Sequence, residues 1–278
     1  MTVELSSPLP GNAQRQRSHK VAASRPRFYF WMAVAMAATA FIGFAPTFWI
    51  PLAQGVPERI AVAAIHGALF FGWTLFVIYQ TWLAMSGNIA RHRDVGMIGV
   101  SLATAMAIFG TLTAIGEAKR QVAAHYAYGA EAFMTVPMAG LILFVLFVIV
   151  AMVNVRRPEW HKRFLIAATA VILNAPIARL YIVYVMMGGH PPPFQGTVGL
   201  AGFPEGPSPA VTTFLLSDLL AESYILAGMV YDWRMRGKVH PAYWWAGGIA
   251  VALHLLKGPF SGTALWHAIA RGLLSFAS

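Results

Sequence analysis

Long apolar stretches alternate with short basic segments along this chain, and this alternation restricts it to a helical membrane fold. Six stretches reach the roughly 20 residues that a helix needs to cross a bilayer core. A seventh stretch, starting at Tyr243, is interrupted by Lys257 and Pro259, so we expect a kinked span or a span followed by an interfacial helix. The stretches cover residues 28–50, 60–84, 95–115, 132–153, 164–187, 210–231 and those from 243 onward.

The composition supports lipid as the solvent of this chain. Of its 278 residues, 58% are hydrophobic and 11% are charged, whereas soluble domains carry about a quarter charged residues. The net charge of +10 comes from clusters between apolar runs, which is the pattern of membrane orientation and argues against nucleic acid as a partner. The absence of cysteine excludes disulfides, thiolate zinc sites, iron–sulfur clusters and c-type haem.

The basic clusters also predict the orientation of the bundle. Residues 1–27 are polar and basic, and we interpret them as a disordered cytoplasmic tail before one transmembrane bundle over residues 28–278. The basic segments near residues 91, 156–163 and 234–238 then fall on the cytoplasmic side of a bacterial inner membrane. This places the C-terminus and the Gly/Pro-rich loop 188–209 on the periplasmic side. The fold class is therefore an all-α membrane protein of seven transmembrane helices.

Three basic inner segments each contain a histidine that lies at the start of the next apolar stretch. They are Arg91-His92-Arg93, His161-Lys162-Arg163 and Val239-His240-Pro241. We hypothesise one helix followed by three repeated hairpins.

Ionisable residues within the predicted spans are the main candidates for a functional site, because such groups are costly in lipid and tend to be paired and functional. Four of these residues reach a similar layer near the outer boundary, a fifth lies one helical turn deeper, and an amide side chain precedes Pro176 on the same span as Arg179. They predict a periplasm-facing polar pocket for a small ligand or a proton: Arg179, Asp218, Glu222, His66, Lys257 and Asn174. The alternative is a structural Arg179–Asp218 ion pair, with Lys257 reaching to the surface.

A haem-b protein is a second hypothesis from a different class, with His66 and either His254 or His267 as axial ligands. A lone histidine on each helix also fits ordinary hydrogen bonding between helices, as does the stripe of His66, Trp73 and Gln80. A structural subunit of a membrane complex is a third possibility. No motif identifies an enzyme, and no cofactor is required.

Cations at the predicted starts of the inner helices form another candidate site. They lie beside the positive ends of helix dipoles, so an anionic phospholipid head group or a phosphate would stabilise them. The positive-inside pattern explains the same residues without a ligand. The candidates are His92, Arg93, His161, Lys162 and Arg163.

Several of these motifs resemble a group of uncharacterised bacterial multi-pass membrane proteins. The resemblance covers roughly residues 60–245 and is carried by the His66…Trp73…Gln80 stripe, His92-Arg93-x-x-Gly96, His161-Lys162-Arg163 and Tyr231-Asp232-x-Arg234. It implies a helical fold and a bacterial inner membrane. Distant relatives with histidine-bearing cores are linked to cytochrome oxidase maturation, so the resemblance also implies an assembly-type role as an alternative. It assigns no active-site residue.

Overall fold

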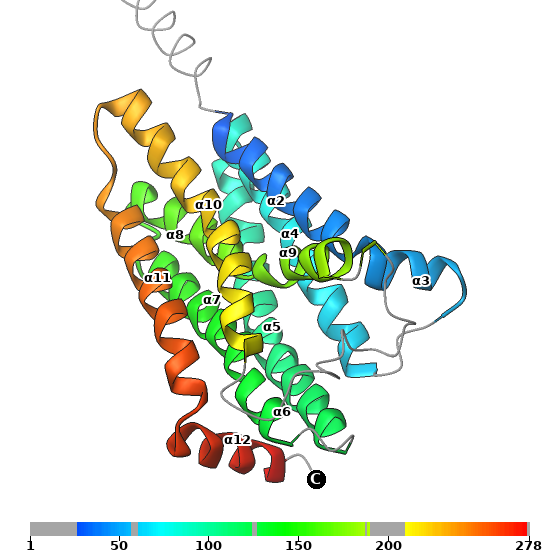
Figure 1. Cartoon of the computed structure of the whole chain (residues 1–278). Coiled ribbons are helices and arrows are strands. Elements are labelled where there is room, and N and C mark those ends of the chain that lie inside the picture. Colours follow the sequence, from blue (N-terminus) through cyan, green and yellow to red (C-terminus); the bar gives the residue numbers. More distant parts are fainter. Residues whose placement is uncertain (1–26, 57–60, 124–126, 187, 190–208, 277–278) are drawn as a thin grey trace, which may run out of the picture.

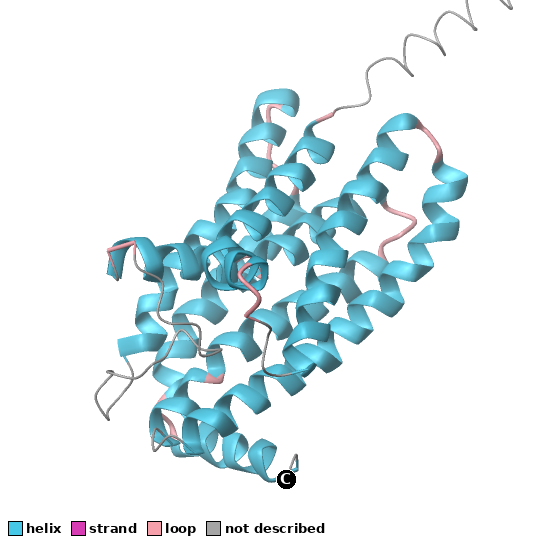
Figure 2. Cartoon of the chain, turned by 90° about the vertical axis from the view of Figure 1, so that its right-hand side faces the viewer, coloured by secondary structure: helices cyan, strands magenta, loops and turns pink. Residues whose placement is uncertain are grey.

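The computed structural model describes residues 27–56, 61–123, 127–186, 188–189 and 209–276, and every regular element among them is a helix (Figures 1 and 2). The predicted tail therefore lies almost entirely outside the described residues, as does most of the loop 188–209. The all-helical fold class is confirmed for the described part of the chain.

Among the described residues, six helical segments are long and apolar enough to cross a membrane. In chain order they comprise α2 to α3 (Phe28–Phe44, η1 Ala45–Trp49, Ile50–Ala53), α4 (Ala61–Ser86), α5 (Ile89–Ala123), α6 and α7 (Ala127–Phe133, Thr135–Val153), α8 to η2 (Pro158–Val171, α9 Asn174–Leu180, Tyr181–Met186) and α10 (Pro209–Arg236). These features are those of an integral membrane protein.

The predicted seventh span corresponds to α11 (Pro241–Ser261), which has 21 residues and is not among the six. The helix continues through Lys257 and Pro259 and ends at Ser261, with Gly262 as its C-cap, after which α12 (Ala264–Phe276) runs across the end of the bundle (Figure 1). Of the two forms expected for this region, the described residues adopt a long helix followed by a separate one.

The helix that follows Pro158 is broken near Pro176, between α8 and α9. Ile172 and Leu173 form a turn, and Asn174 is the first residue of α9. Because a proline has no amide hydrogen to donate, the helix carbonyls before Pro176 lose one partner, which favours such a break. Asn174 therefore lies inside the bundle at an interrupted helix, where its side chain is buried.

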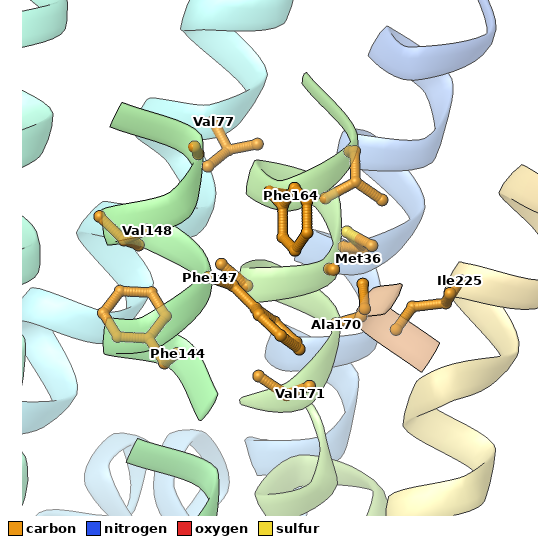
Figure 3. Close-up of a cluster of buried hydrophobic side chains, with 14 of the residues drawn as sticks. Met36, Val77, Phe144, Phe147, Val148, Phe164, Ala170, Val171 and Ile225 are labelled. Atoms are coloured by element: carbon orange, nitrogen blue, oxygen red, sulfur yellow. The ribbon is translucent and has the colours of Figure 1, made fainter. Parts of the chain in front are cut away.

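The apolar core joins helices that are far apart in the sequence (Figure 3). Phe144 and Phe147 of α7 lie in one buried cluster with Phe164 of α8, Met36 of α2 and Ile225 of α10. The small residues Ala167, Ala168 and Ala170 of α8 are fully buried, and small side chains allow close helix packing in membranes. Helices α7 and α8 thus form the centre against which α2, α10 and α11 pack.

Candidate functional site

A buried ionic cluster links α9, α10 and α11. The Asp218 carboxylate accepts a hydrogen bond of 2.9 Å from the Asn174 side-chain amide and pairs directly with the Lys257 ammonium. Asp218 is fully buried and Lys257 is 3% exposed. Lys257 is therefore held inside the bundle by Asp218 and does not extend to the surface, contrary to one of our alternatives.

His254 lies between the two carboxylates of this cluster. Its Nε2 is 3.1 Å from Glu222 Oε1, and its Nδ1 is 3.4 Å from Asp218 Oδ2. Neither ring nitrogen reaches hydrogen-bond geometry, and Glu222 Oε1 is likewise buried without a hydrogen bond. An unmade hydrogen bond at a buried polar group is costly, so this region differs from a fully satisfied structural ion pair.

The helical repeat explains how these side chains meet. Asp218 and Glu222 are four residues apart on α10, and His254 and Lys257 are three residues apart on α11, so each pair shares a helix face. Helices α10 and α11 are neighbours, and α10 also packs on α9. We name Asp218, Glu222, His254, Lys257 and Asn174 the buried ionic cluster.

Arg179, which we expected to join this cluster, contacts other groups. Its guanidinium lies 4.3 Å from the centre of the Phe44 ring and donates a 3.1 Å hydrogen bond to the Ala175 carbonyl. The described contacts of the Asp218 carboxylate are with Asn174 and Lys257, and they do not include the Arg179 ion pair that we considered as an alternative. On α9, Asn174 therefore faces α10 while Arg179 faces α2.

His66 and its stripe on α4 lie apart from the buried ionic cluster. His66 contacts the Phe70 ring at 4.1 Å between centroids, and its Nδ1 is buried without a partner. Trp73 donates a 3.1 Å hydrogen bond to Thr169 of α8, which is the hydrogen bonding between helices that the stripe predicted. The side-chain amide of Gln80 has no hydrogen-bond partner.

The geometry gives no support to a haem held by the three named histidines. His254 lies against Asp218 and Glu222, while His267 binds Glu131 at 2.5 Å. Helix α4, which carries His66, packs mainly on α2 and α5, whereas α11 packs on α7, α8 and α10. Within the described ranges, no group of three or more His, Cys, Asp or Glu side chains is arranged to hold a metal ion.

The candidate inner anion site is largely neutralised by carboxylates. Arg163 is fully buried and binds Asp232 through two hydrogen bonds of 2.5 and 2.8 Å. Glu159 accepts hydrogen bonds of 2.7 Å from both Lys162 and Arg163. Lys162 and Arg163 thus already have anionic partners inside the protein.

His92 and His161 occupy equivalent positions in two hairpins. His92 Nδ1 lies 3.3 Å from the Gln80 carbonyl of α4, and His161 Nδ1 lies 2.9 Å from the Ala151 carbonyl of α7. The two rings are 6.4 Å apart. His240, the histidine of the third hypothesised hairpin, instead caps α11 by accepting a hydrogen bond from the Ala242 amide. The histidine-to-carbonyl contact is therefore shared by two of the three hairpins.

Sequence reasoning did not select three of the carboxylates that matter in these contacts. Asp232 and Glu159 lie in the basic inner segments, where an acidic residue among cations is a usable signal for a buried pair. Glu131 lies at the start of the fourth predicted span, and its partner His267 is 136 positions away. No local pattern connects these two residues.

Comparisons of the chain with protein-family models, characterised proteins and solved structures find no match. The described part of the chain is a helical bundle with six membrane-span-like helices and charged groups in its interior, which are the features of an integral membrane protein.

Proposed function

We propose that the protein is an inner-membrane transport-type protein in which the buried ionic cluster takes up protons from a polar pocket open to the periplasm and carries them across the membrane. The observation that carries this proposal is the position of His254, whose two unsatisfied ring nitrogens lie beside Asp218 and Glu222. A histidine between two carboxylates offers two ring nitrogens that can accept or donate a proton.

The charges in the cluster supply the driving force for proton binding. With His254 neutral, the contacting groups hold two carboxylates and one ammonium, so one negative charge is unbalanced. An unbalanced charge away from water is costly. A proton on the Glu222 carboxylate, whose Oε1 lies 3.1 Å from His254 Nε2, would remove the imbalance.

Arg179 supplies a separate cationic group for a ligand in this proposal. It lies on α9 beside Phe44, one helix face away from Asn174 and the buried ionic cluster. Since α9 begins at a break in the helix, a shift of α9 would move Arg179 and Asn174 together. Broken helices border the substrate sites of many transporters, and we assign Arg179 the role of anion clamp with His66 at the edge.

The proposed topology has seven spans, with α11 as the seventh, a cytoplasmic N-terminus and α12 on the periplasmic surface. The positive-inside pattern supports this orientation. The bilayer is the partner of the apolar faces. Because Lys162 and Arg163 are paired internally, we restrict the proposed contact with anionic head groups to His92, Arg93 and His161.

Infrared titration of the protein in nanodiscs tests the proposal. We expect the carbonyl band of a protonated carboxylic acid to appear and disappear reversibly between roughly pH 4 and 9, which spans the pKa values of exposed and buried carboxyl groups in proteins. Glu222→Gln should remove or shift this band, whereas Glu117→Gln, at an ion pair on α5, should leave it. If no buried acid titrates in this range, the cluster is a static structural element and the proposal fails.

A further inference from the structure

A shallow depression lies at the end of the bundle where α6 meets α12. It has a volume of about 450 Å³ and is lined by Tyr128, Glu131, Gly262, Ala264, His267 and Arg271. Glu131 and His267 are 9% and 5% exposed. The depression is thus an open cavity with an acid and a base at its wall.

Glu131 and His267 form a pair with defined geometry. His267 Nδ1 lies 2.5 Å from Glu131 Oε2, and Trp266 Nε1 donates a 2.7 Å hydrogen bond to the Glu131 carbonyl. The Tyr128 ring stacks on the imidazole at 4.4 Å. Because the carboxylate holds Nδ1, the free position of the ring is Nε2, and this atom is buried without a hydrogen bond.

The other charged groups around the pair are also defined. Arg271 of α12 donates to the His267 carbonyl at 3.1 Å and lies 3.8 Å from Glu131 Oε2. On α5, which packs against α6 and α12, Glu117 and Arg120 form an ion pair of 3.0 Å. Neither Glu117 nor Arg120 lines the depression.

The helices that carry the Glu131–His267 pair pack against the helices that carry the buried ionic cluster. Helix α6 carries Glu131 and packs on α10, α11 and α12. Phe133 contacts Phe214 at 5.3 Å, and Phe214 lies one helical turn before Asp218. Along α11, Gly262 at the depression follows Lys257 by five residues, which is about 7 Å of helix rise.

We propose that Glu131 and His267 form the proton entry site that serves the buried ionic cluster, and this inference deepens the proposed function and rests on it. Because His267 Nε2 is closed to water in the structure, a local opening toward the depression must precede proton uptake. A hydronium ion then protonates Nε2 and is left as water, and the resulting imidazolium passes its Nδ1 proton to the Glu131 carboxylate. Glu131 then donates this proton, through water, to the buried ionic cluster. The neutral His267 ring, which now carries its proton on Nε2, returns to the tautomer with the proton on Nδ1. The pair gains and loses one proton in each cycle.

A pH jump is applied to the nanodisc-embedded protein while the infrared carboxylic-acid band is recorded over time. The rate at which the band appears reports proton entry, and its final amplitude reports proton binding by the buried ionic cluster. Glu131→Gln and His267→Gln should slow the appearance of the band by roughly a hundredfold, the lower range of what a positioned proton-transfer group contributes. The final amplitude should remain unchanged. Glu117→Gln is the matched control, because it removes a nearby carboxylate outside the pair, and it should keep the original rate. Imidazole in the buffer should restore the rate of His267→Ala.

The outcomes separate this inference from the proposed function. If the band titrates in the unaltered protein and the rates of both Glu131→Gln and His267→Gln equal the original rate, the entry site is wrong while the proton-binding cluster stands. If the band never titrates, both proposals fail. Should Glu131→Gln fail to fold, the rate of the folded His267 variants, with and without imidazole, decides the matter.

Discussion

The Arg163 guanidinium and the Asp232 carboxylate form a two-point ion pair in which both side chains are fully buried, joining the start of α8 to the end of α10. Glu159 adds a second carboxylate to Arg163 at 2.7 Å. A buried pair of this kind leaves an uncompensated charge when one partner is removed.

Asp232→Asn should therefore lower the free energy of unfolding by about 3–5 kcal/mol, as expected for a broken buried ion pair. Arg120→Gln is the comparison, because Arg120 pairs with Glu117 on α5, away from Asp232, with the two side chains 36% and 21% exposed, and exposed pairs contribute about 1 kcal/mol or less. Denaturant unfolding in detergent measures both. Equal effects of the two changes would contradict the assignment of the Arg163–Asp232 pair as the main inner ion pair.

Lys257→Met should also destabilise the protein by about 3–5 kcal/mol at neutral pH, because it leaves the Asp218 carboxylate without its cation. Adding Asp218→Asn should recover much of the loss, since the buried charge is then gone. A double-mutant cycle of unfolding free energies gives the coupling. Lys238→Met, at an exposed position, is the control. Additive effects of the two cluster substitutions would show that Lys257 and Asp218 do not interact.

Gly228→Ala should be destabilising by about 1–3 kcal/mol, the usual cost of overpacking. A Cβ at this position of α10 would overlap the fully buried Tyr243 side chain of α11. At Gly248, a Cβ would meet no atom within 4 Å, so Gly248→Ala should stabilise α11 by up to about 1 kcal/mol through helix propensity. If thermal unfolding ranks the two variants in the opposite order, the α10–α11 packing described here is incorrect.

Protonation of His240 should make the free energy of unfolding depend on pH. Burial, reinforced by the nearby Arg163 guanidinium, lowers the pKa of His240 below its ordinary value of 6.5, and its neutral Nδ1 accepts the Ala242 amide at 3.1 Å. The unfolded chain binds the proton more tightly, so this contribution is complete above pH 6.5 and declines as the pH falls toward the lowered pKa.

His240→Asn should keep a helix cap and remove this component from the pH profile of the unfolding free energy. The difference between the pH profiles of the unaltered protein and the variant, measured from above pH 6.5 downward, gives the contribution of His240 to the free energy of unfolding. Identical profiles would mean that the cap does not depend on a neutral histidine.

The helices could be predicted from the sequence because each apolar run is a local signal. Boundaries differed where polar residues continue a helix, as in α5, which extends to Ala123 beyond the apolar stretch 95–115. Asp218 and Glu222 could be selected as candidates because ionisable residues within a span tend to be paired and functional, and both are buried.

The partners of these residues depend on helix rotation and packing, which no local pattern encodes. Arg179 was therefore expected beside Asp218, although the structure places Lys257 there. The Arg163–Asp232 pair joins residues 69 positions apart. His254 was selected only as a haem ligand, because its contact with Glu222 exists only after α10 and α11 pack.

Proton uptake into proteoliposomes tests the central claim most directly. With a potassium diffusion potential as the driving force and an enclosed pH-sensitive dye as the readout, the unaltered protein should take up protons faster than protein-free vesicles. Glu222→Gln should abolish the excess, and Glu117→Gln should retain it. An unaltered protein that is no faster than empty vesicles, or a Glu222→Gln variant as fast as the unaltered protein, would contradict the account.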